Sequence, residues 1–302
     1  MTSGTGRVRP RRARTWLAAH VMLLPWLVGA LGITIGPLIA SLVLSLTNYS
    51  ILGSTEFVGL DNYAAVFSDP KFFKSMSVTL MYVCLAVPLQ LGLALGLALL
   101  LEKGIRWLGV YRAGFYLPSL LGASVAIALL WRQIFKTDGL VNAVLSIFGV
   151  TGRNWLYDPD TALLTLVLLQ VWTFGSPMII FLAGLKEIPK ELIEAATVDG
   201  AGYGRRLKSI VLPLLTPMIF FNLILQTVGA FQAFNQAYIV SGGTGGPVDS
   251  TLFYTLYVYI VGFIEYRMGY ASALAWVLVI FIGILTAVQF IVSRKWVYYG
   301  DQ

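Results

Sequence analysis

The sequence predicts an all-α integral membrane protein of about six transmembrane helices, and three observations support this. Only 12% of its 302 residues are charged, whereas 58% are hydrophobic, and the mean hydropathy is +0.79. A soluble domain carries roughly 25% charged residues. Apolar stretches long enough to cross about 30 Å of hydrocarbon recur along the chain. Lys and Arg flank these stretches instead of interrupting them. The outer surface is therefore expected to face lipid.

Six stretches qualify as spans, and none has Asp, Glu, Lys or Arg in its interior. The first contains Pro25 and Pro37, so we expect a bent helix there. The later spans are expected to be single helices, separated by short loops with turn-forming residues. The expected spans cover residues 17–47, 76–101, 113–131, 161–185, 211–240 and 269–293.

The distribution of Lys and Arg predicts the orientation, because cytoplasmic segments carry an excess of both. If the N-terminus is cytoplasmic, fifteen of the 21 basic residues lie inside. The sequence therefore predicts a multi-pass protein of a prokaryotic cytoplasmic membrane with both termini inside. It divides into a basic N-terminal segment (1–16), which favours anionic lipid headgroups, one transmembrane domain (17–293) and a tail (294–302). The six basic residues outside are Lys71, Lys74, Arg132, Lys136, Arg153 and Arg267.

Several functions are disfavoured by what the sequence lacks. The basic residues are not interleaved with stacking aromatics, so we expect no nucleic-acid partner. One histidine, His20, and one cysteine, Cys84, cannot build a metal centre. The spans hold no acidic residue for coupling to an ion gradient or for intramembrane catalysis. No phosphate-binding G-x-x-x-x-G-K-[ST] motif occurs either. We therefore predict no catalytic residue, metal or cofactor in this chain, so energy for any pumping must come from a partner.

The loop between the fourth and fifth spans, about residues 187–210, contains a predicted short helix. Pro189 suits its first turn, and the acidic Glu191 and Glu194 follow near its positive end. Gly200 then permits the turn that closes the helix. From these residues alone, the helix is either an ordinary solvated surface helix or one that docks in a groove on another protein. Its small-residue face is formed by Leu192, Ala195, Ala196 and Asp199.

The longer pattern distinguishes between these alternatives. Glu194-Ala195-Ala196-x-x-Asp199-Gly200-Ala201, followed by Leu207-x-x-Ile210-x-Leu212-Pro213, resembles the EAA loop of binding-protein-dependent ABC importers. Position 207 is Leu where Phe is common in that family. The resemblance implies a coupling helix that inserts into a cleft on a cytoplasmic ATPase. The residues expected to couple are Glu191, Glu194, Ala195, Ala196, Asp199, Gly200 and Ala201.

Further segments resemble the carbohydrate branch of these permeases, and in particular its maltose-permease-F-like members. The resemblance implies a second, homologous permease subunit and two copies of a P-loop ATPase that binds ATP and Mg. It also implies an extracytoplasmic solute-binding protein and a sugar as solute. The segments are Leu117-Pro118-Ser119, Trp131-Arg132-x-Ile134-Phe135, Ala183-Gly184-Leu185-x-x-Ile188-Pro189, Phe231-Gln232-x-Phe234 and Gly245-Gly246-Pro247.

A sugar site is expected to use amides, hydroxyls and aromatic rings, without charge. In the fifth span, Gln232, Asn235 and Gln236 have the spacing of one helix face. Gln232 and Asn235 also match positions that line the sugar pocket in the maltose-permease relative. The alternative is that these amides only join helices by hydrogen bonds.

The fourth span offers Trp172, Gly175 and Ser176, just before Pro177, which is expected to free backbone groups locally. Trp172 either stacks on a sugar or is an ordinary core or interface residue. Ser119 is a weaker candidate in the third span, because small polar residues often serve close packing. The absence of charge favours a neutral mono- or oligosaccharide. The external Arg132 and Arg153 leave a glycerol-phosphate-like solute open.

The sequence thus predicts a permease subunit of an ATP-driven importer that works by alternating access. Two alternatives from other classes remain: an ion-coupled secondary carrier and a non-transporting membrane scaffold.

Overall fold

The computed structural model describes residues 22–50, 53, 55–102, 107–122 and 124–298. In these residues the architecture is helical, with one isolated β-bridge between Thr47 and Phe57. Four helices are long and apolar enough to cross a membrane: Met22–Ser45, Pro70–Glu102, Tyr203–Phe231 and Met268–Ser293. When each of two bent helix pairs is counted as one crossing, the number reaches the predicted six. The basic segment 1–16 and the end of the tail, residues 299–302, lie outside the described residues.

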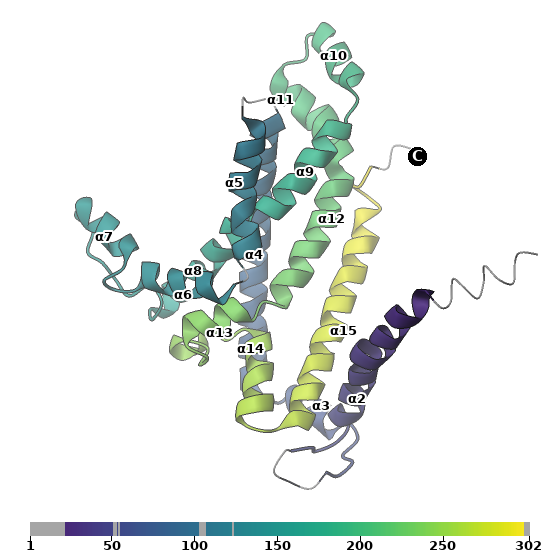
Figure 1. Ribbon diagram of the computed structural model, residues 1–302, viewed down its shortest axis with the longest axis vertical. Coiled ribbons are helices and arrows are strands. Elements are labelled where there is room, and N and C mark those ends of the chain that lie inside the picture. The colour runs from purple at the N-terminus through teal and green to yellow at the C-terminus, as the bar shows by residue number, and fades with distance from the viewer. Residues whose placement is uncertain (1–21, 51–52, 54, 103–106, 123, 299–302) are drawn as a thin grey trace, which may run out of the picture.

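The element order can be followed in Figure 1. The spanning elements of the first half are η1 (Ala30–Ile35) with α2 (Gly36–Ser45), α4 (Pro70–Glu102), α5 (Leu108–Leu121) and α6 (Val125–Phe135). Those of the second half are α8 (Pro159–Trp172), α9 (Gly175–Glu187), α12 (Leu212–Phe231) and α15 (Met268–Ser293). The connecting elements are α3 (Asp61–Val66), α7 (Leu140–Ile147), α10 (Lys190–Val198), α11 (Tyr203–Arg206), η2 (Leu207–Val211), α13 (Asn235–Ser241), η3 (Pro247–Asp249), α14 (Tyr254–Tyr259) and η4 (Ile260–Ile264).

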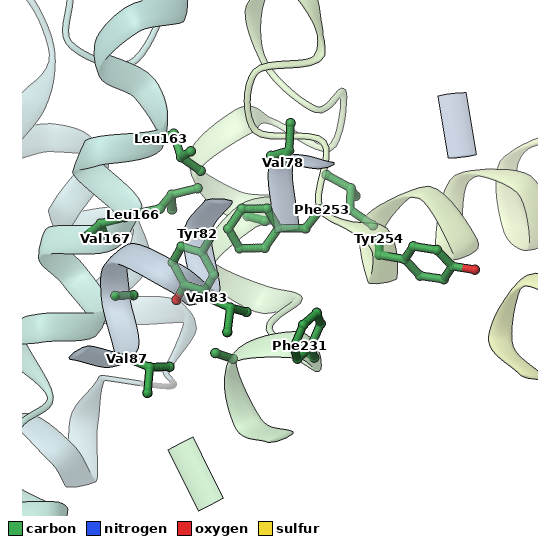
Figure 2. Close-up of a cluster of buried hydrophobic side chains, with 14 of the residues drawn as sticks. Val78, Tyr82, Val83, Val87, Leu163, Leu166, Val167, Phe231, Phe253 and Tyr254 are labelled. Carbon is green, nitrogen blue, oxygen red and sulfur yellow. The ribbon is translucent and has the colours of Figure 1, made fainter. Parts of the chain in front are cut away.

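The core forms around α4, which contacts α8, α9, α12 and α14. Alanines at positions 86, 94 and 98 of α4 are fully buried, so neighbouring helices can approach closely. Tyr82 is 2% exposed, and its ring centroid lies 4.5 Å from that of Phe253. Figure 2 shows both rings among side chains of the fourth span and of α12. The buried face of α4 therefore organises the packing of the other helices.

The first span packs against α15 at one end and leaves most of its apolar surface exposed. Trp26 is 68% and Ile33 is 81% exposed. A π-helical segment, η1, precedes Pro37, so the expected proline effect takes the form of a local change in helix type. In Figure 1 the N-terminal half of this span leans away from the bundle. Such a surface requires lipid or another protein around it.

The third and fifth spans depart from the predicted single helices. The third consists of α5 and α6, and the direction changes by 94° between Leu108–Leu121 and Val125–Ile147. Ser124 caps α6 by accepting a hydrogen bond from the N–H of Ile127 at 3.3 Å. The fifth crossing begins earlier than expected, at Tyr203, and α12 ends at Phe231. The segment from Asn235 forms the separate helix α13.

The predicted loop 241–268 contains an apolar helical segment, Tyr254–Ile264, that the sequence analysis missed. Its Tyr254 backbone N–H donates to Thr79 Oγ1 at 2.9 Å, which fastens α14 to α4. Tyr257 and Tyr270 both donate hydroxyl hydrogen bonds to the carboxylate of Asp69, the latter at 2.8 Å. Figure 1 places α3 and α14 at the end of the molecule opposite α10.

Candidate functional site

The predicted coupling helix is α10, and all nine of its residues are exposed or half-buried. Pro189 stands at its N-cap rather than in its first turn. Along its predicted small-residue face, Leu192 is 45% exposed, Ala195 and Asp199 are also exposed, and Ala196 is half-buried. The carboxylate-bearing residues Glu191 and Glu194 are exposed as well. The helix therefore stands clear of the bundle, as Figure 1 shows, with an uncovered outer surface.

The C-terminus of α10 is closed by a Schellman arrangement. Gly200 has a φ of +77°, and its N–H donates to the carbonyl of Thr197 at 3.0 Å. The N–H of Ala201 donates to the carbonyl of Ala196 at 2.9 Å. A residue with a Cβ is strained in this left-handed conformation, which explains the glycine. Arg206 of α11 also donates to the hydroxyl of Thr197, so the chain folds back on the helix after the turn.

The fourth span breaks at Thr173, four residues before Pro177. The angle between α8 and α9 is 41°. Pro177 lies within the first turn of α9, where a missing N–H leaves no helical hydrogen bond unmade. The proline is therefore compatible with a new helix start, while the groups freed by the break must find other partners.

Those partners come from two other helices. Ser119 of α5 donates to the carbonyl of Thr173 at 2.8 Å and accepts from the N–H of Ser176 at 2.8 Å. Gln90 of α4 donates to the same carbonyl at 3.0 Å and to the Thr173 hydroxyl at 3.1 Å. Ser119 and Gln90 thus compensate both sides of a helix break within an apolar bundle. This places Ser119 beside Ser176 and gives Ser119 a structural role.

Gln90 belongs to a longer polar chain that the sequence analysis missed. It is only 1% exposed, and its Oε1 accepts from Nε2 of Gln170 at 3.1 Å. Tyr82 in turn donates to Gln170 Oε1 at 3.3 Å. A glutamine in the interior of an otherwise apolar span was a detectable signal, because such a group needs a partner in lipid. Its partner could not be read from the sequence.

Two of the predicted solute contacts lie within packed surroundings. A side chain at Gly175 would place its Cβ 2.2 Å from the carbonyl oxygen of Phe115, so glycine is required where α9 meets α5. Trp172 is half-buried, with its ring centroid 6.1 Å from that of Trp131. Trp131 donates its indole N–H to the carbonyl of Thr165 at 2.9 Å. These contacts fix the geometry at the break.

The predicted helix face formed by Gln232, Asn235 and Gln236 is wrong, because these residues do not share a helix. Gln232 is the C-cap of α12, and Phe234, with φ −131° and ψ −57°, separates it from α13. The carbonyl of Ala233 accepts from the hydroxyl of Thr255, a distant contact that favours the break. Gln232 and Asn235 are exposed, and Gln236 is half-buried.

Three interruptions of the helices nevertheless meet in space. Gln236, just after the break between α12 and α13, donates to the carbonyl of Gly122 at 3.4 Å. Gly122 is the C-cap of α5, and a Cβ built there would lie 2.1 Å from Cγ2 of Thr173. The end of α5, the break in the fourth span and the start of α13 are therefore adjacent. The polar groups gathered there are amides, hydroxyls and freed carbonyls without formal charge.

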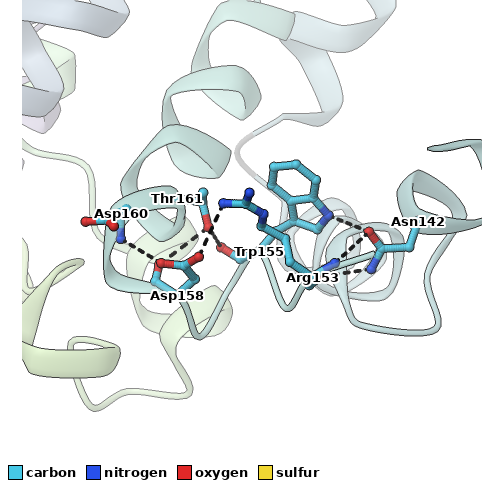
Figure 3. A network of polar contacts seen from close by, with 6 residues as sticks. All are labelled: Asn142, Arg153, Trp155, Asp158, Asp160 and Thr161. Carbon is cyan, nitrogen blue, oxygen red and sulfur yellow. Dashed lines mark hydrogen bonds and ion pairs between the residues drawn. The ribbon is translucent and has the colours of Figure 1, made fainter. Parts of the chain in front are cut away.

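The predicted external loop 132–160 contains two ion pairs, Lys136–Asp138 and Arg153–Asp158. Arg153 lies 3.5 Å from Asp158 and 5.4 Å from the centroid of the Trp155 ring. Asn142 fixes the same loop, because it accepts from the Trp155 indole at 2.8 Å and donates to the carbonyl of Arg153 at 2.8 Å (Figure 3). The guanidinium of Arg153 is therefore already engaged, which weakens the case for an anionic solute at this position.

Comparison with known proteins matches residues 62–298 to one family, described as binding-protein-dependent transport system inner membrane component. The chain is 47% identical over 288 residues to the probable ABC transporter permease protein YesP of Bacillus subtilis (strain 168), covering 95% of this chain and 93% of YesP. It is 34% identical over 265 residues to the lactose transport system permease protein LacF of Rhizobium radiobacter, covering 86% and 88%. A chain in the crystal structure of a bacterial alginate ABC transporter, in complex with its alginate pentasaccharide-bound periplasmic protein, has the same fold. Its TM-score is 0.81, with 21% identity and coverage of 96% and 98%.

Proposed function

The chain belongs to the family of binding-protein-dependent transport system inner membrane components, and we propose that it is a permease subunit of an ATP-driven importer for a sugar or sugar-like solute. One observation carries the solute class: three interrupted helices meet around uncharged hydrogen-bonding groups. Discontinuous helices supply free backbone groups at solute sites in transporters. The absence of charge suits a neutral polyhydroxylated solute, and the likeness to a lactose transport permease supports the same class.

The proposed solute contacts come from the surroundings of these three interruptions. Gln236 contacts the end of α5 directly, and the exposed Gln232 and Asn235 stand on either side of Phe234 in the same connection. Trp172 and Ser176 flank the neighbouring break, with Gly175 and Ser119 as its packing partners. In this proposal the amides and hydroxyls bind sugar hydroxyls, and Trp172 stacks on an apolar sugar face.

In this proposal, energy enters at the end of the molecule that carries α10. We propose that α10 and its closing turn, from Glu191 to Ala201, insert into a P-loop ATPase subunit, two copies of which bind ATP and Mg. A second homologous permease completes the pathway, and a solute-binding protein delivers the sugar from outside. Both termini and α10 are then cytoplasmic. Closure of the ATPases opens the pathway outward, and hydrolysis returns it inward.

The test is uptake by the reconstituted complex with its binding protein. Asn235→Ala should raise the half-saturating sugar concentration by about three- to tenfold, as expected for one lost hydrogen bond, while ATPase activity stays coupled to the binding protein. Asn154→Ala, which removes an exposed amide elsewhere, is the matched control. Unchanged uptake kinetics in Asn235→Ala would remove that residue from the solute site. Sugar uptake that follows an ion gradient without ATP would overturn the importer proposal.

A further inference from the structure

A cavity of about 750 Å³ lies between the proposed coupling helix and the ends of the spans. It is lined by α10, by α11 and η2 after it, and by the ends of α4 and α9. Small-molecule sites fall in this range of volume. Figure 1 shows that these elements gather at the end of the molecule that carries α10. Any molecule in the cavity touches both the coupling helix and the bundle.

One part of the lining is apolar. It comes from buried and half-buried side chains of four elements, which leaves room for a hydrocarbon portion rather than for a fully polar ligand. The spans α4 and α9 end here, so this apolar wall adjoins the ends of both spans. The apolar residues are Leu99, Leu185, Ile188, Ile193, Leu207 and Val211.

The remaining lining carries both signs of charge. Lys186, Lys190 and Arg206 supply three cations, and Glu102 and Glu194 supply two carboxylates. None of these five takes part in an ion pair that the structure records. A purely anionic ligand would meet the two carboxylates. A ligand with one phosphate and one ammonium can instead complement both signs.

Arg206 identifies where the phosphate group would bind. Its Nε is buried, and it finds no hydrogen-bond partner among the residues that the structure describes. Its Nη1 donates to the hydroxyl of Thr197 on α10. A buried, unsatisfied guanidinium nitrogen is costly, and a phosphate oxygen is a strong acceptor for it. A ligand at this position would therefore contact a side chain that is itself hydrogen-bonded to α10.

We propose that this cavity binds the headgroup of a zwitterionic phospholipid from the adjacent leaflet, with its phosphate on Arg206. Glu102 and Glu194 then face the ammonium group, and the apolar wall accommodates the glycerol and acyl portion. The inference rests on the proposed function, because it places α10 at the cytoplasmic surface. The bound lipid joins the coupling helix to the spans, so that movement of the helix is transmitted to them.

The experiment is native mass spectrometry of the complete transporter with added phosphatidylethanolamine, phosphatidylglycerol or inorganic phosphate. The wild type should retain phosphatidylethanolamine, and Arg206→Gln should retain about tenfold less. Arg205→Gln is the matched control, because Arg205 is the exposed neighbour and does not line the cavity. Thr197→Val removes the contact of Arg206 with α10 and the bond from the Thr197 hydroxyl to the carbonyl of Ile193. It should keep the lipid, which shows that a defect in α10 alone does not cause release.

Equal retention by wild type and Arg206→Gln would overturn the site. Equal retention of phosphatidylglycerol would overturn the zwitterionic headgroup, and displacement of the lipid by millimolar inorganic phosphate would overturn the lipid as the source of the phosphate group. Sugar uptake is measured on the same samples. Normal uptake without lipid retention would refute this inference alone, whereas lipid retention without any sugar uptake would refute the proposed function alone.

Discussion

The proposed coupling helix α10 and the helix breaks hold their residues in opposite ways. Every residue of α10 is exposed or half-buried, and its last turn is closed by local backbone hydrogen bonds around Gly200. At the break in the fourth span, Gln90 and Ser119 reach Thr173 from helices 83 and 54 residues away in the chain. The first region leaves its surface uncovered. The second maintains an interior arrangement of backbone groups.

This difference teaches that a docking element can be encoded locally, whereas a solute pathway depends on contacts across the fold. It also predicts different defects. Damage to α10 should disconnect ATP hydrolysis from transport, whereas damage at the break should alter solute affinity while coupling survives. The variants below test that separation.

The largest effect is expected at Gly200. Gly200→Val places a β-branched residue at a φ of +77°, at a cost of roughly 1–2 kcal/mol, and should open the end of α10. Uptake should fall at least tenfold while the chain remains inserted in the membrane. Gly202→Val is the matched control, because Gly202 has an ordinary φ of −66° and open space around it. Normal uptake in Gly200→Val would disprove the coupling role.

A smaller, separate effect is expected at Gln90. Gln90→Leu keeps the approximate volume but removes hydrogen bonds to Thr173 and Gln170. Polar contacts within membranes contribute about 0.6–1.7 kcal/mol each. The half-saturating sugar concentration should therefore rise about three- to eighteenfold, with ATPase stimulation by the binding protein preserved. Gln289→Leu, the same change at a contact with Thr227, should leave that concentration unchanged. If ATP hydrolysis were no longer coupled to transport in Gln90→Leu, the proposed separation of roles between α10 and the helix breaks would be wrong.

Ser119→Ala sharpens the same comparison. The substitution removes the acceptor for the Ser176 N–H and one of the two donors to the Thr173 carbonyl. Gln90 remains as the other donor to that carbonyl. We expect a rise of about two- to thirteenfold in the half-saturating concentration, since a typical net hydrogen bond contributes about 0.5–1.5 kcal/mol. Uptake measured over a sugar titration gives this value. Combined with Gln90→Leu, the effect should exceed the product of the two single effects, because the carbonyl then loses both partners.

The smallest effect on transport is expected outside both regions, at Asp69. Burial raises the pKa of this carboxylate, but hydrogen bonds from Tyr257 and Tyr270 and from backbone N–H groups outweigh burial, so its pKa lies below 3.8. The carboxylate therefore stabilises the fold above that pH and loses its contribution as the pH falls through the lowered pKa. Asp69→Asn should lower the melting temperature by about 2–4 °C at pH 7, with uptake kinetics unchanged. The difference in melting temperature between Asp69→Asn and wild type should become smaller below pH 3.8. A difference that stays constant with pH would contradict the stabilising role of the ionised carboxylate.

The local signals in the sequence predicted much of this molecule. The apolar stretches predicted the crossings, and the EAA-like pattern predicted family membership, which the match over residues 62–298 confirms. The prediction that Gly200 ends a helix is confirmed by its positive φ. In each case the determining interactions lie within a few neighbouring residues.

The breaks after α5 and α12 could not be predicted, because distant residues stabilise them. The sequence does not predict the end of α12, because the carbonyl of Ala233 finds its partner in Thr255. Thr255 lies on α14, a helix within the predicted loop 241–268. The 94° bend after α5 places Gly122 against Thr173, a contact between different spans. The partners of Gln90 could not be predicted for the same reason, although a glutamine inside an apolar span is a visible signal. The solute and coupling roles of the individual residues remain predictions.

Gln90 and Ser119 stabilise the break in the fourth span through its backbone, which has a consequence for how the solute preference of such a protein can evolve. The backbone N–H of Ser176 donates a hydrogen bond to Ser119, while the side chain of Ser176 is exposed. The fold therefore uses the peptide group at this position and leaves the side chain to vary. In the proposed solute site, substitutions at position 176 are therefore expected to change the preferred solute while the hydrogen bonds of Gln90 and Ser119 keep the helix break intact. One scaffold of this kind can be adapted to many solutes over the course of evolution.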